Sequence, residues 1–541
     1  MDWLLPPGTR RDNFWIYSSA AIVGLAGLVK LRQGALNFLY SETHCYQSVR
    51  TNQAVYPYVN CFSVSPDGTF SKVFQASANS ELAQNADPGY AMPGLWDGHG
   101  HLLQYGEFLN SIDLFGTQSM EEVRSRIREY VNDSPKAGSR EEWLRGVGWD
   151  QMALGQMPTA ADLVADATLA DLYIMLDRVD VHCIWVSQAV LDLLPDSIPD
   201  VDGGEVVREP GMGVFCDNAM DMVMALWPKP GNKKKRQFLQ NAMSKLNEVG
   251  LVGIHDAGVS PGNLELYKTL ARGDDWTVRV YANGALGSWG SALIEPYTDR
   301  PDASGSLLVN ASELVYVTTA WAAQGFQVNI HAIGDLANRY AVDAITAALR
   351  LLCPDQDIRA CQSRLRFRIE HSQIIHPDDQ ARIHSVGIIP SIQPTHATSD
   401  MAYAEKRLGG ERTRKEAYRM RSLLDVQPIL GSDFPVEPPN PFQGIYAAMT
   451  RKSPHTGQAP EGFPNGWYTE ESLDLDQAIR GFTEGPAYGG FTKGKSGVIK
   501  PGAYADWVVL DRPLETIAIE DLRTLSVRET WVGGRMVYKR D

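Results

Sequence analysis

The alternation of helical and strand-like segments over residues 93–485 is the feature that most constrains the fold. QFLQNAMSKLNEVG leads into the apolar run LVGIHDAG, and ELVYVTTAWAAQG leads into FQVNIHAIGD in the same order. Repeated helix-then-strand order is typical of units whose strands form a parallel sheet. We therefore predict an α/β fold with a distorted (β/α)8 TIM barrel. The stretch 110–250 is longer than one β–α connection requires, so we expect an insertion there.

The two ends of the chain have a different pattern. YVNCFSVSPDGTFSKVF predicts two strands joined by an Asp-Gly turn, and SGVIKPGAYADWVVLD and SVRETWVGGRMVYKR predict further short strands. We expect residues 45–92 and 486–541 to pair as one small β-sandwich domain, with the barrel of residues 93–485 between them.

An apolar segment lies within the N-terminal residues 1–44. Residues 14–29, FWIYSSAAIVGLAGLV, contain no charge and have basic residues on both sides. As a helix they would be about 24 Å long, and flanking basic side chains can extend that reach toward the roughly 30 Å of a bilayer core. No small-x-small cleavage site follows, so we predict an uncleaved single-pass anchor and a membrane-associated protein. The alternative is a buried or partner-facing helix.

Charge and cysteine content narrow the class of protein. Fifty basic and 65 acidic residues give a net charge of −15, which argues against a nucleic-acid partner. The six cysteines are scattered without a CxxC pair, which indicates neither a disulfide framework nor a zinc knuckle. Some of them could still pair in an oxidising compartment. The sequence is compatible with a homodimer.

Histidines and one aspartate stand at the ends of predicted strands. GLWDGHGHL places His99 and His101 two positions apart, so that both point to one side of a strand. His331 closes FQVNIH, His371 closes LRFRIEH and Asp433 closes VQPILGSD. A barrel gathers its strand ends on one face, and imidazole and carboxylate groups hold Zn²⁺ with a position open for water. A structural role is the simpler reading of each histidine alone, but the five residues together predict a divalent metal site.

Ordered motifs from about residue 52 to 541 resemble the amidohydrolase superfamily, in its amidohydrolase-3 (YtcJ-like) branch. The resemblance implies a distorted barrel with a small β-sandwich built from both chain ends. The matching segments are MPGLWDGHGHL, GVGWD (146–150), HCIWVS (182–187), NGALGSWGSALIEPY (283–297), HAIGDLAN (331–338), RIEHSQ (368–373), SIQPTHATSD (391–400), GSDFPVEPPNP (431–441) and GVIKPGAYADWVVLD (497–511).

The resemblance also implies a ligand set. His99, His101, His331 and Asp433 would ligate the metal, and His371 would bind a second ion or act as a hydrogen-bonding group. Many relatives place a lysine, which can be carboxylated to bridge two ions, in the strand before the DGALGS segment, where this chain has Arg279. A guanidinium stays protonated and cannot be modified in that way. We therefore expect one ion per chain rather than two, with Zn²⁺ first and Fe²⁺ or Mn²⁺ as alternatives.

A divalent ion lowers the pKa of a bound water from 15.7 to about 7. By the family pattern, Asp433 would take the proton from that water, and His371 and His396 are candidates to polarise a carbonyl. For His396 a structural role is an equal alternative. Further residues could line a substrate pocket, with packing as the favoured alternative for the tryptophan: Trp149, Asp150, Arg178, His182, His255 and Arg279.

These features predict a metal-dependent hydrolase that cleaves a non-peptide carbon–nitrogen bond in an amide, N-acyl or formamide-like small molecule. One scaffold hosts many reactions, so a deaminase or a lactone or ester hydrolase is an alternative. A membrane-tethered inactive protein that binds a small molecule or a partner is another. The complete set of five expected metal-site residues argues against an inactive protein, whereas Arg279 argues for it.

Overall fold

The computed structural model describes residues 41–541 except positions 135, 202, 284, 287–291, 306 and 308. The predicted anchor helix at 14–29 therefore lies outside the described residues. Among the residues that are described, no helix combines the length and the apolar character that crossing a bilayer requires.

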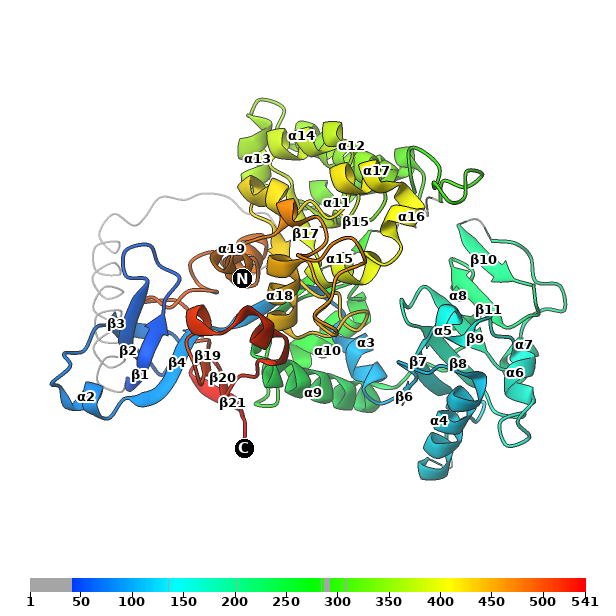
Figure 1. Ribbon diagram of the computed structural model, residues 1–541, viewed down its shortest axis with the longest axis horizontal. Helices are drawn as coiled ribbons and strands as arrows, with labels where there is room; N and C mark the ends of the chain where they lie inside the picture. Colours follow the sequence, from blue (N-terminus) through cyan, green and yellow to red (C-terminus); the bar gives the residue numbers. More distant parts are fainter. Residues whose placement is uncertain are drawn as a thin grey trace, which may run out of the picture.

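Parallel strands form a central barrel, which confirms the predicted TIM-barrel-like α/β fold (Figure 1). One sheet has the order β13-β12-β5 and the other has the order β14-β15-β16-β17-β18. A parallel bridge between Gly100 and Phe434 connects the end of β5 to the segment after β18, so the two sheets close on each other. The strands are β5 (Leu95–Gly100), β12 (Leu251–Ala257), β13 (Arg279–Asn283), β14 (Ala285–Leu286), β15 (Asn329–Ala332), β16 (Arg368–His371), β17 (Ile389–Ile392) and β18 (Ile429–Leu430).

Amphipathic helices surround the barrel. In α12, for example, Ala341, Val342, Ile345 and Leu349 recur at helical spacing and are buried in the main core. The helices are α3 (Leu102–Phe108), α9 (Asn232–Glu248), α10 (Pro261–Leu270), α11 (Ala311–Ala323), α12 (Asp335–Leu352), α13 (Ile358–Leu365), α14 (Pro377–Val386), α15 (Pro394–Asp400), α16 (Ala404–Leu408), α17 (Gly410–Glu416), α18 (Pro441–Thr450), α19 (Leu475–Gly481) and α20 (Glu484–Gly489).

The insertion forms its own six-stranded sheet, on the right in Figure 1, with the order β10-β11-β9-β8-β7-β6. It ends earlier than the predicted limit of residue 250. Helix α9 buries Leu239, Met243 and Leu246 in the core of the barrel and packs on α3 and β12, so it belongs to the barrel. The elements of the insertion are β6 (Ile112–Asp113), α4 (Met120–Asp133), β7 (Leu144–Trp149), α5 (Gln151–Leu154), α6 (Ala160–Val164), β8 (Ile174–Arg178), β9 (Cys183–Val186), α7 (Gln188–Leu191), β10 (Gly204–Val207), β11 (Val214–Asp217) and α8 (Met220–Met224).

Strands from both chain ends share one seven-stranded sheet with the order β21-β20-β19-β4-β1-β2-β3. The antiparallel pairing of β4 with β19 joins the two ends. Helix α20 packs on β5 and β18, so the barrel continues past the expected boundary at 485. The elements are β1 (Glu42–Arg50), β2 (Tyr58–Val64), β3 (Phe70–Phe74), α2 (Glu81–Gln84), β4 (Asp87–Pro93), β19 (Trp507–Leu510), β20 (Glu529–Val532) and β21 (Arg535–Lys539).

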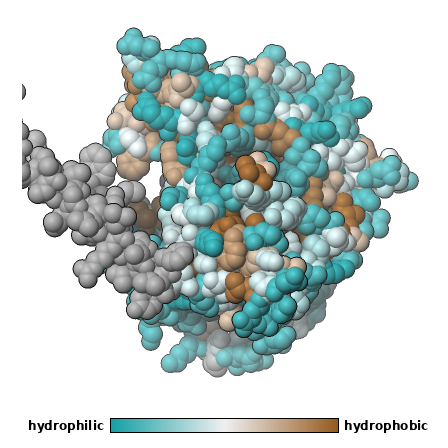
Figure 2. All heavy atoms as spheres, turned by 90° about the vertical axis from the view of Figure 1, so that its left-hand side faces the viewer, coloured by the Kyte–Doolittle hydropathy of each residue, from teal (hydrophilic) through white to brown (hydrophobic). Residues whose placement is uncertain are grey.

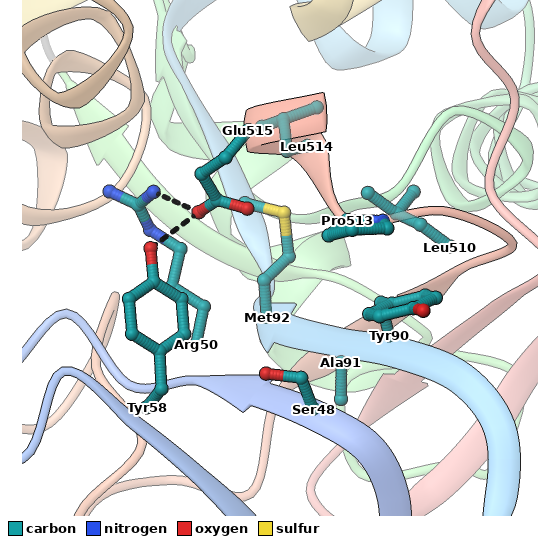
Figure 3. A pocket seen from close by; sticks show the side chains of 10 residues that line it. All are labelled: Ser48, Arg50, Tyr58, Tyr90, Ala91, Met92, Leu510, Pro513, Leu514 and Glu515. Atoms are coloured by element: carbon teal, nitrogen blue, oxygen red, sulfur yellow. Dashed lines mark hydrogen bonds and ion pairs between the residues drawn. The ribbon is translucent and has the colours of Figure 1, made fainter. Parts of the chain in front are cut away.

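Polar contacts reinforce the junction of the two chain ends (Figure 3). Arg50 Nη1 and the Tyr58 hydroxyl both donate to Glu515 Oε1, each at 2.7 Å. The adjoining cavity has a volume of about 20 Å³, which is too small for a substrate. On the described part of the face in Figure 2, hydrophobic side chains are scattered among hydrophilic ones, the usual pattern of a water-exposed surface.

All six cysteines form disulfides, so the expectation of no disulfide framework is wrong. Cys45 lies opposite Cys61 in the β1–β2 pair, and Cys183 lies opposite Cys216 in the β9–β11 pair. Cys353, directly after α12, is bonded to Cys361 in α13. Strand register brings two of the three cysteine pairs together. The spacing of the cysteines along the sequence does not reveal that register.

Candidate metal centre

The predicted metal-site residues meet at the carboxyl ends of the barrel strands. His99 lies in β5, His331 in β15 and His371 at the end of β16. His101 is the N-cap residue before α3, and His396 lies in α15, which follows β17. Asp433 follows β18 by three positions. Segments far apart in the sequence thus deliver five imidazoles and one carboxylate to one end of the barrel.

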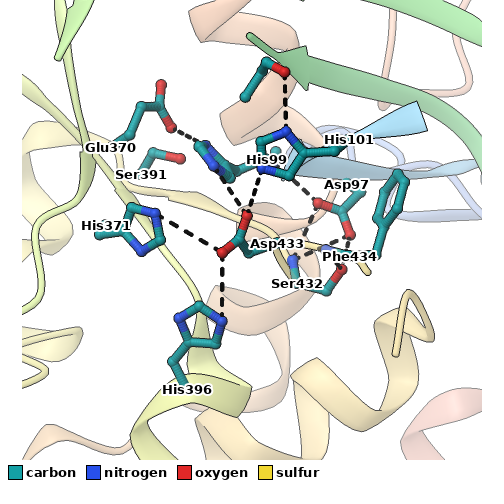
Figure 4. A network of polar contacts seen from close by, with 12 residues as sticks. Asp97, His99, His101, Glu370, His371, Ser391, His396, Ser432, Asp433 and Phe434 are labelled. Atoms are coloured by element: carbon teal, nitrogen blue, oxygen red, sulfur yellow. Dashed lines mark hydrogen bonds and ion pairs between the residues drawn. The ribbon is translucent and has the colours of Figure 1, made fainter. Parts of the chain in front are cut away.

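Asp433 is at the centre of this group (Figure 4). Its Oδ1 atom lies 3.2 Å from His99 Nε2 and 3.0 Å from His101 Nε2. Its Oδ2 atom lies 3.9 Å from His371 Nε2 and 3.7 Å from His396 Nε2. The two carboxylate oxygens therefore face two different pairs of imidazoles.

The glycines around His99 allow β5 to approach β18 closely. A Cβ atom at Gly98 would collide with the Ile429 side chain, and one at Gly100 would collide with the ring of Phe434. Alternate residues of a strand point to opposite sides. The DGHGH segment thus directs its imidazoles toward the site, and its glycines, which have no side chain, lie against the neighbouring segment.

Two site residues have unusual backbone conformations. His371 has φ of 69° and Asp433 has φ of 63°, a region that residues other than glycine rarely adopt. The Asp433 N–H donates to the His99 carbonyl at 2.8 Å, which holds the turn after β18 against β5. Strained residues of this kind cluster at functional sites.

Several ring nitrogens have no hydrogen-bond partner although they are buried. They are His331 Nε2, both ring nitrogens of His371, and His396 Nε2. The His331 and His371 rings lie 4.1 Å apart between centroids. Burial, followed by the charge of His99, lowers the pKa of His331 to about 3. Burial and the neighbouring His331 likewise lower the pKa of His371 well below its usual value. Neutral imidazole is the form that binds a metal.

The residues therefore fit a divalent cation. Ligand atoms of His99, His371 and Asp433 all lie within 4.8 Å of one another. Burial alone lowers the pKa of His99, but its hydrogen bonds to Asp433 and Glu370 raise that pKa to about 10. The pKa of Asp433 is held well below its usual value because the hydrogen bonds from His101 and His99 outweigh its burial. The negative charges of Asp433 and Glu370 that stabilise a proton on His99 would equally stabilise a metal cation that displaces it.

The Nδ1 atoms of His99 and His101 contact groups other than Asp433. His99 Nδ1 lies 2.7 Å from Glu370 Oε2, and His101 Nδ1 lies 3.0 Å from the Ala257 carbonyl. Both partners are acceptors, so each Nδ1 carries a proton, and each Nε2 faces Asp433, where a bound metal would take the place of the Nε2 proton. Asp97 accepts from the His99 N–H and from the Ser432 N–H and hydroxyl.

Sequence reasoning missed Glu370 and Asp97. A signal was present for both, because each is an acidic residue inside an otherwise buried strand next to a predicted ligand. Acidic residues are seldom fully buried without a partner, so such positions deserve a functional explanation.

The predicted pocket residues do not join the Asp433 cluster. Trp149 is buried in the core of the insertion, and its Nε1 donates to the Leu176 carbonyl. Asp150 caps α5. Arg178 forms an ion pair with the neighbouring Asp180, and His182 Nδ1 lies 3.1 Å from Asp217 Oδ1. The packing alternative for Trp149 is the one that the structure supports.

His255 and Arg279 require correction. His255 is fully buried inside the barrel, with its Nδ1 2.5 Å from Arg368 Nη1, so it does not line a pocket mouth. Arg279 begins β13 and is bonded to Asp506 of the chain-end domain at 2.6 Å, with its guanidinium over the Tyr504 ring. Arg279 therefore points away from the metal centre and bears neither on a second ion nor on loss of activity.

Comparisons with known proteins agree with this geometry. A family model described as "Amidohydrolase family" matches residues 83–538. The chain is 27% identical to the putative amidohydrolase YtcJ of Bacillus subtilis (strain 168), covering 89% of this chain and 96% of that protein. It is 23% identical to the N-substituted formamide deformylase of Arthrobacter pascens, covering 87% and 93%.

A plant protein and a solved structure show similar coverage. LONG AFTER FAR-RED 3 of Arabidopsis thaliana is 27% identical over 87% of this chain and 86% of its own. The crystal structure of an uncharacterised metal-dependent hydrolase from Pyrococcus horikoshii OT3 superposes with a TM-score of 0.69 at 22% identity, covering 88% of this chain and 99% of that one. The similarity to this solved structure supports the fold.

Proposed function

The chain belongs to the amidohydrolase family, and we propose that it is a metal-dependent hydrolase that cleaves a carbon–nitrogen bond other than a peptide bond. The substrate class is an amide, an N-acyl compound or a formamide-like small molecule. The observation that carries the proposal is the Asp433 carboxylate, with one oxygen held by His99 and His101 and the other facing His371 and His396.

The proposed ligands are His99, His101, His331 and Asp433, with His371 beside them. One divalent ion per chain is proposed, with Zn²⁺ first because imidazole and carboxylate suit it, and Fe²⁺ or Mn²⁺ as alternatives. An ion bound there supplies Lewis-acid chemistry that makes water acidic near neutral pH. Within the described residues, His99, His371 and Asp433 are the one group of this kind, which supports binding of a divalent ion at this place.

The protein's own groups move the proton. Asp433 Oδ2 accepts a proton as the water oxygen attacks the carbonyl carbon, and it returns that proton to the leaving nitrogen as the carbon–nitrogen bond breaks. His396, whose Nε2 has no hydrogen-bond partner, can donate to the oxygen on which negative charge develops. The products are an amine and a carboxylic acid, which releases its proton near neutral pH to become a carboxylate.

A substrate panel tests the proposal. The purified, metal-loaded chain is incubated with N-formyl amines, N-acyl amino acids, simple lactones and amino-substituted ring compounds. N-formyl amines come first because one relative is named as a deformylase of N-substituted formamides. We expect release of amine and carboxylate from an N-formyl or N-acyl substrate, measured by amine derivatisation. Turnover of lactones or ring amines alone would favour the alternative reactions, and no turnover with metal bound would favour an inactive binding protein.

A further inference from the structure

A charged layer lies inside the barrel directly beneath His99. Arg368 and Glu370 are two positions apart on β16, and both are buried, with Arg368 0% exposed. Barrel interiors are normally filled by apolar side chains. An ion pair placed there loses its hydration, and replacing such a pair by apolar residues is often neutral or stabilising. Fold stability alone therefore does not account for this pair.

The contacts of the layer connect four strands. Arg368 Nη2 lies 2.8 Å from Glu370 Oε1 and donates to the Gly98 carbonyl at 3.0 Å and to Ser391 Oγ at 3.2 Å. Its Nη1 donates to His255 Nδ1 at 2.5 Å. Burial alone would raise the pKa of Glu370, but the Arg368 guanidinium and the His99 hydrogen bond lower it to about 2. Both terminal nitrogens of the guanidinium are thus engaged, and they hold the carboxylate in one place.

We propose that Glu370, fixed by Arg368, is a positioning residue that sets the tautomer and ring orientation of the metal ligand His99. The 2.7 Å contact keeps a proton on Nδ1, so that Nε2, which faces Asp433, is the atom that would bind the metal (Figure 4). The corresponding contact of His101 uses a backbone carbonyl, so Glu370 is the partner that a substitution can remove. This inference rests on the metal centre of the proposed function.

The test measures metal affinity without substrate. Zn²⁺ binding to the full chain is followed by competition with a chromophoric chelator for the wild type, Glu370→Gln and Glu370→Ala. We expect Glu370→Ala to weaken Zn²⁺ binding by about 10- to 100-fold. Glu370→Gln preserves the volume and an acceptor, so it should fold and show a smaller loss. The Co²⁺-substituted protein should show a shifted visible absorption band in both variants.

Asp379→Asn is the matched control. Asp379 is 1% exposed and forms ion pairs with Arg339 and Arg382, so its substitution also removes a buried, paired carboxylate. It should leave Zn²⁺ affinity and the Co²⁺ band unchanged. Zn²⁺ affinity within twofold of the wild type in the folded Glu370 variants would overturn the positioning role while leaving the proposed function intact. Failure of the wild type to bind Zn²⁺, Fe²⁺ or Mn²⁺ would overturn both.

The disulfides carry a second, independent inference. They lie in three different parts of the chain: the chain-end sheet, the insertion and the helices around the barrel. No cysteine of the chain is left free. Disulfides form and persist in oxidising compartments and are rare where glutathione keeps thiols reduced. Complete pairing in three separate subregions is the pattern of a chain that matures in an oxidising environment.

We infer that the hydrolase domain matures on the oxidising side of a membrane. If residues 14–29 are the anchor that the sequence predicts, the domain then faces away from the cytosol. Each disulfide forms when two thiols lose two protons and two electrons to a disulfide-bearing oxidant, which is reduced to a dithiol.

Thiol trapping in cells that express the full chain tests this inference. Cells are quenched with acid, free thiols are alkylated, disulfides are then reduced, and the newly released thiols are labelled with a heavier reagent. We expect all six cysteines to carry the heavy label by peptide mass spectrometry, whereas a cytosolic protein of the same lysate carries the light label. Light label on the cysteines of the mature chain would overturn the inference.

Discussion

Asp433→Asn is expected to lower kcat by about 10³-fold or more while the protein stays folded. The carboxamide occupies the same volume, but its Oδ2 equivalent cannot accept the proton that the reaction transfers, and general-base groups typically contribute 10²- to 10⁴-fold. It also removes the negative charge that faces His99, His101, His371 and His396. Initial rates on a substrate that the wild type hydrolyses measure the loss, and circular dichroism and thermal unfolding report the fold.

Asp379→Asn serves as the control for this variant as well, because it removes a buried carboxylate remote from the Asp433 cluster. Its rate should match that of the wild type. An Asp433→Asn enzyme that retains more than a tenth of the wild-type rate would contradict the assignment of Asp433 as the proton acceptor.

Removal of the metal is the second change for which a large effect on turnover is expected. Dialysis against a chelator should abolish turnover, and one equivalent of Zn²⁺, Fe²⁺ or Mn²⁺ per chain should restore it. Binding to the folded state alone stabilises a protein by about 2.7 kcal/mol when the ligand is at 100 times its Kd. We therefore expect the melting temperature to rise on addition of metal, measured by scanning calorimetry.

His99→Ala is the comparison for the thermal shift, since it removes a ligand that Asp433 contacts directly. Its melting temperature should respond weakly to metal. Full recovery only with two equivalents of metal would contradict the single-ion centre. This stoichiometry is the decisive test, because Arg279 pairs with Asp506, the residue before β19, and does not face the site.

Local patterns are sufficient to predict the barrel and much of the candidate site. Short apolar runs that end in His331 or His371 mark strand ends, and parallel strands bring those ends to one face. The two-residue spacing of His99 and His101 places both imidazoles on one side. These inferences need only the direction of a strand and the parity of a residue along it.

Contacts between residues far apart in the sequence could not be predicted from such local patterns. The partner of His99 is Glu370, 271 positions away, and the pairing depends on how β5 and β16 lie across the barrel. Arg279 was assigned to the site because its strand was recognised, but it stands at the opposite end of that strand. Strand register likewise decides that Cys183 meets Cys216. The predicted end of the insertion, residue 250, was wrong. The sequence of α9 is that of an ordinary amphipathic helix, and it does not say that the buried face packs in the barrel.

Anomalous X-ray diffraction at the zinc absorption edge, from crystals of the Zn²⁺-loaded protein, tests the central claim most directly. The account predicts a strong anomalous peak among His99 Nε2, His101 Nε2 and the Asp433 carboxylate. A well-ordered map with these side chains turned away from one another, and with anomalous density only elsewhere in the molecule, would contradict it.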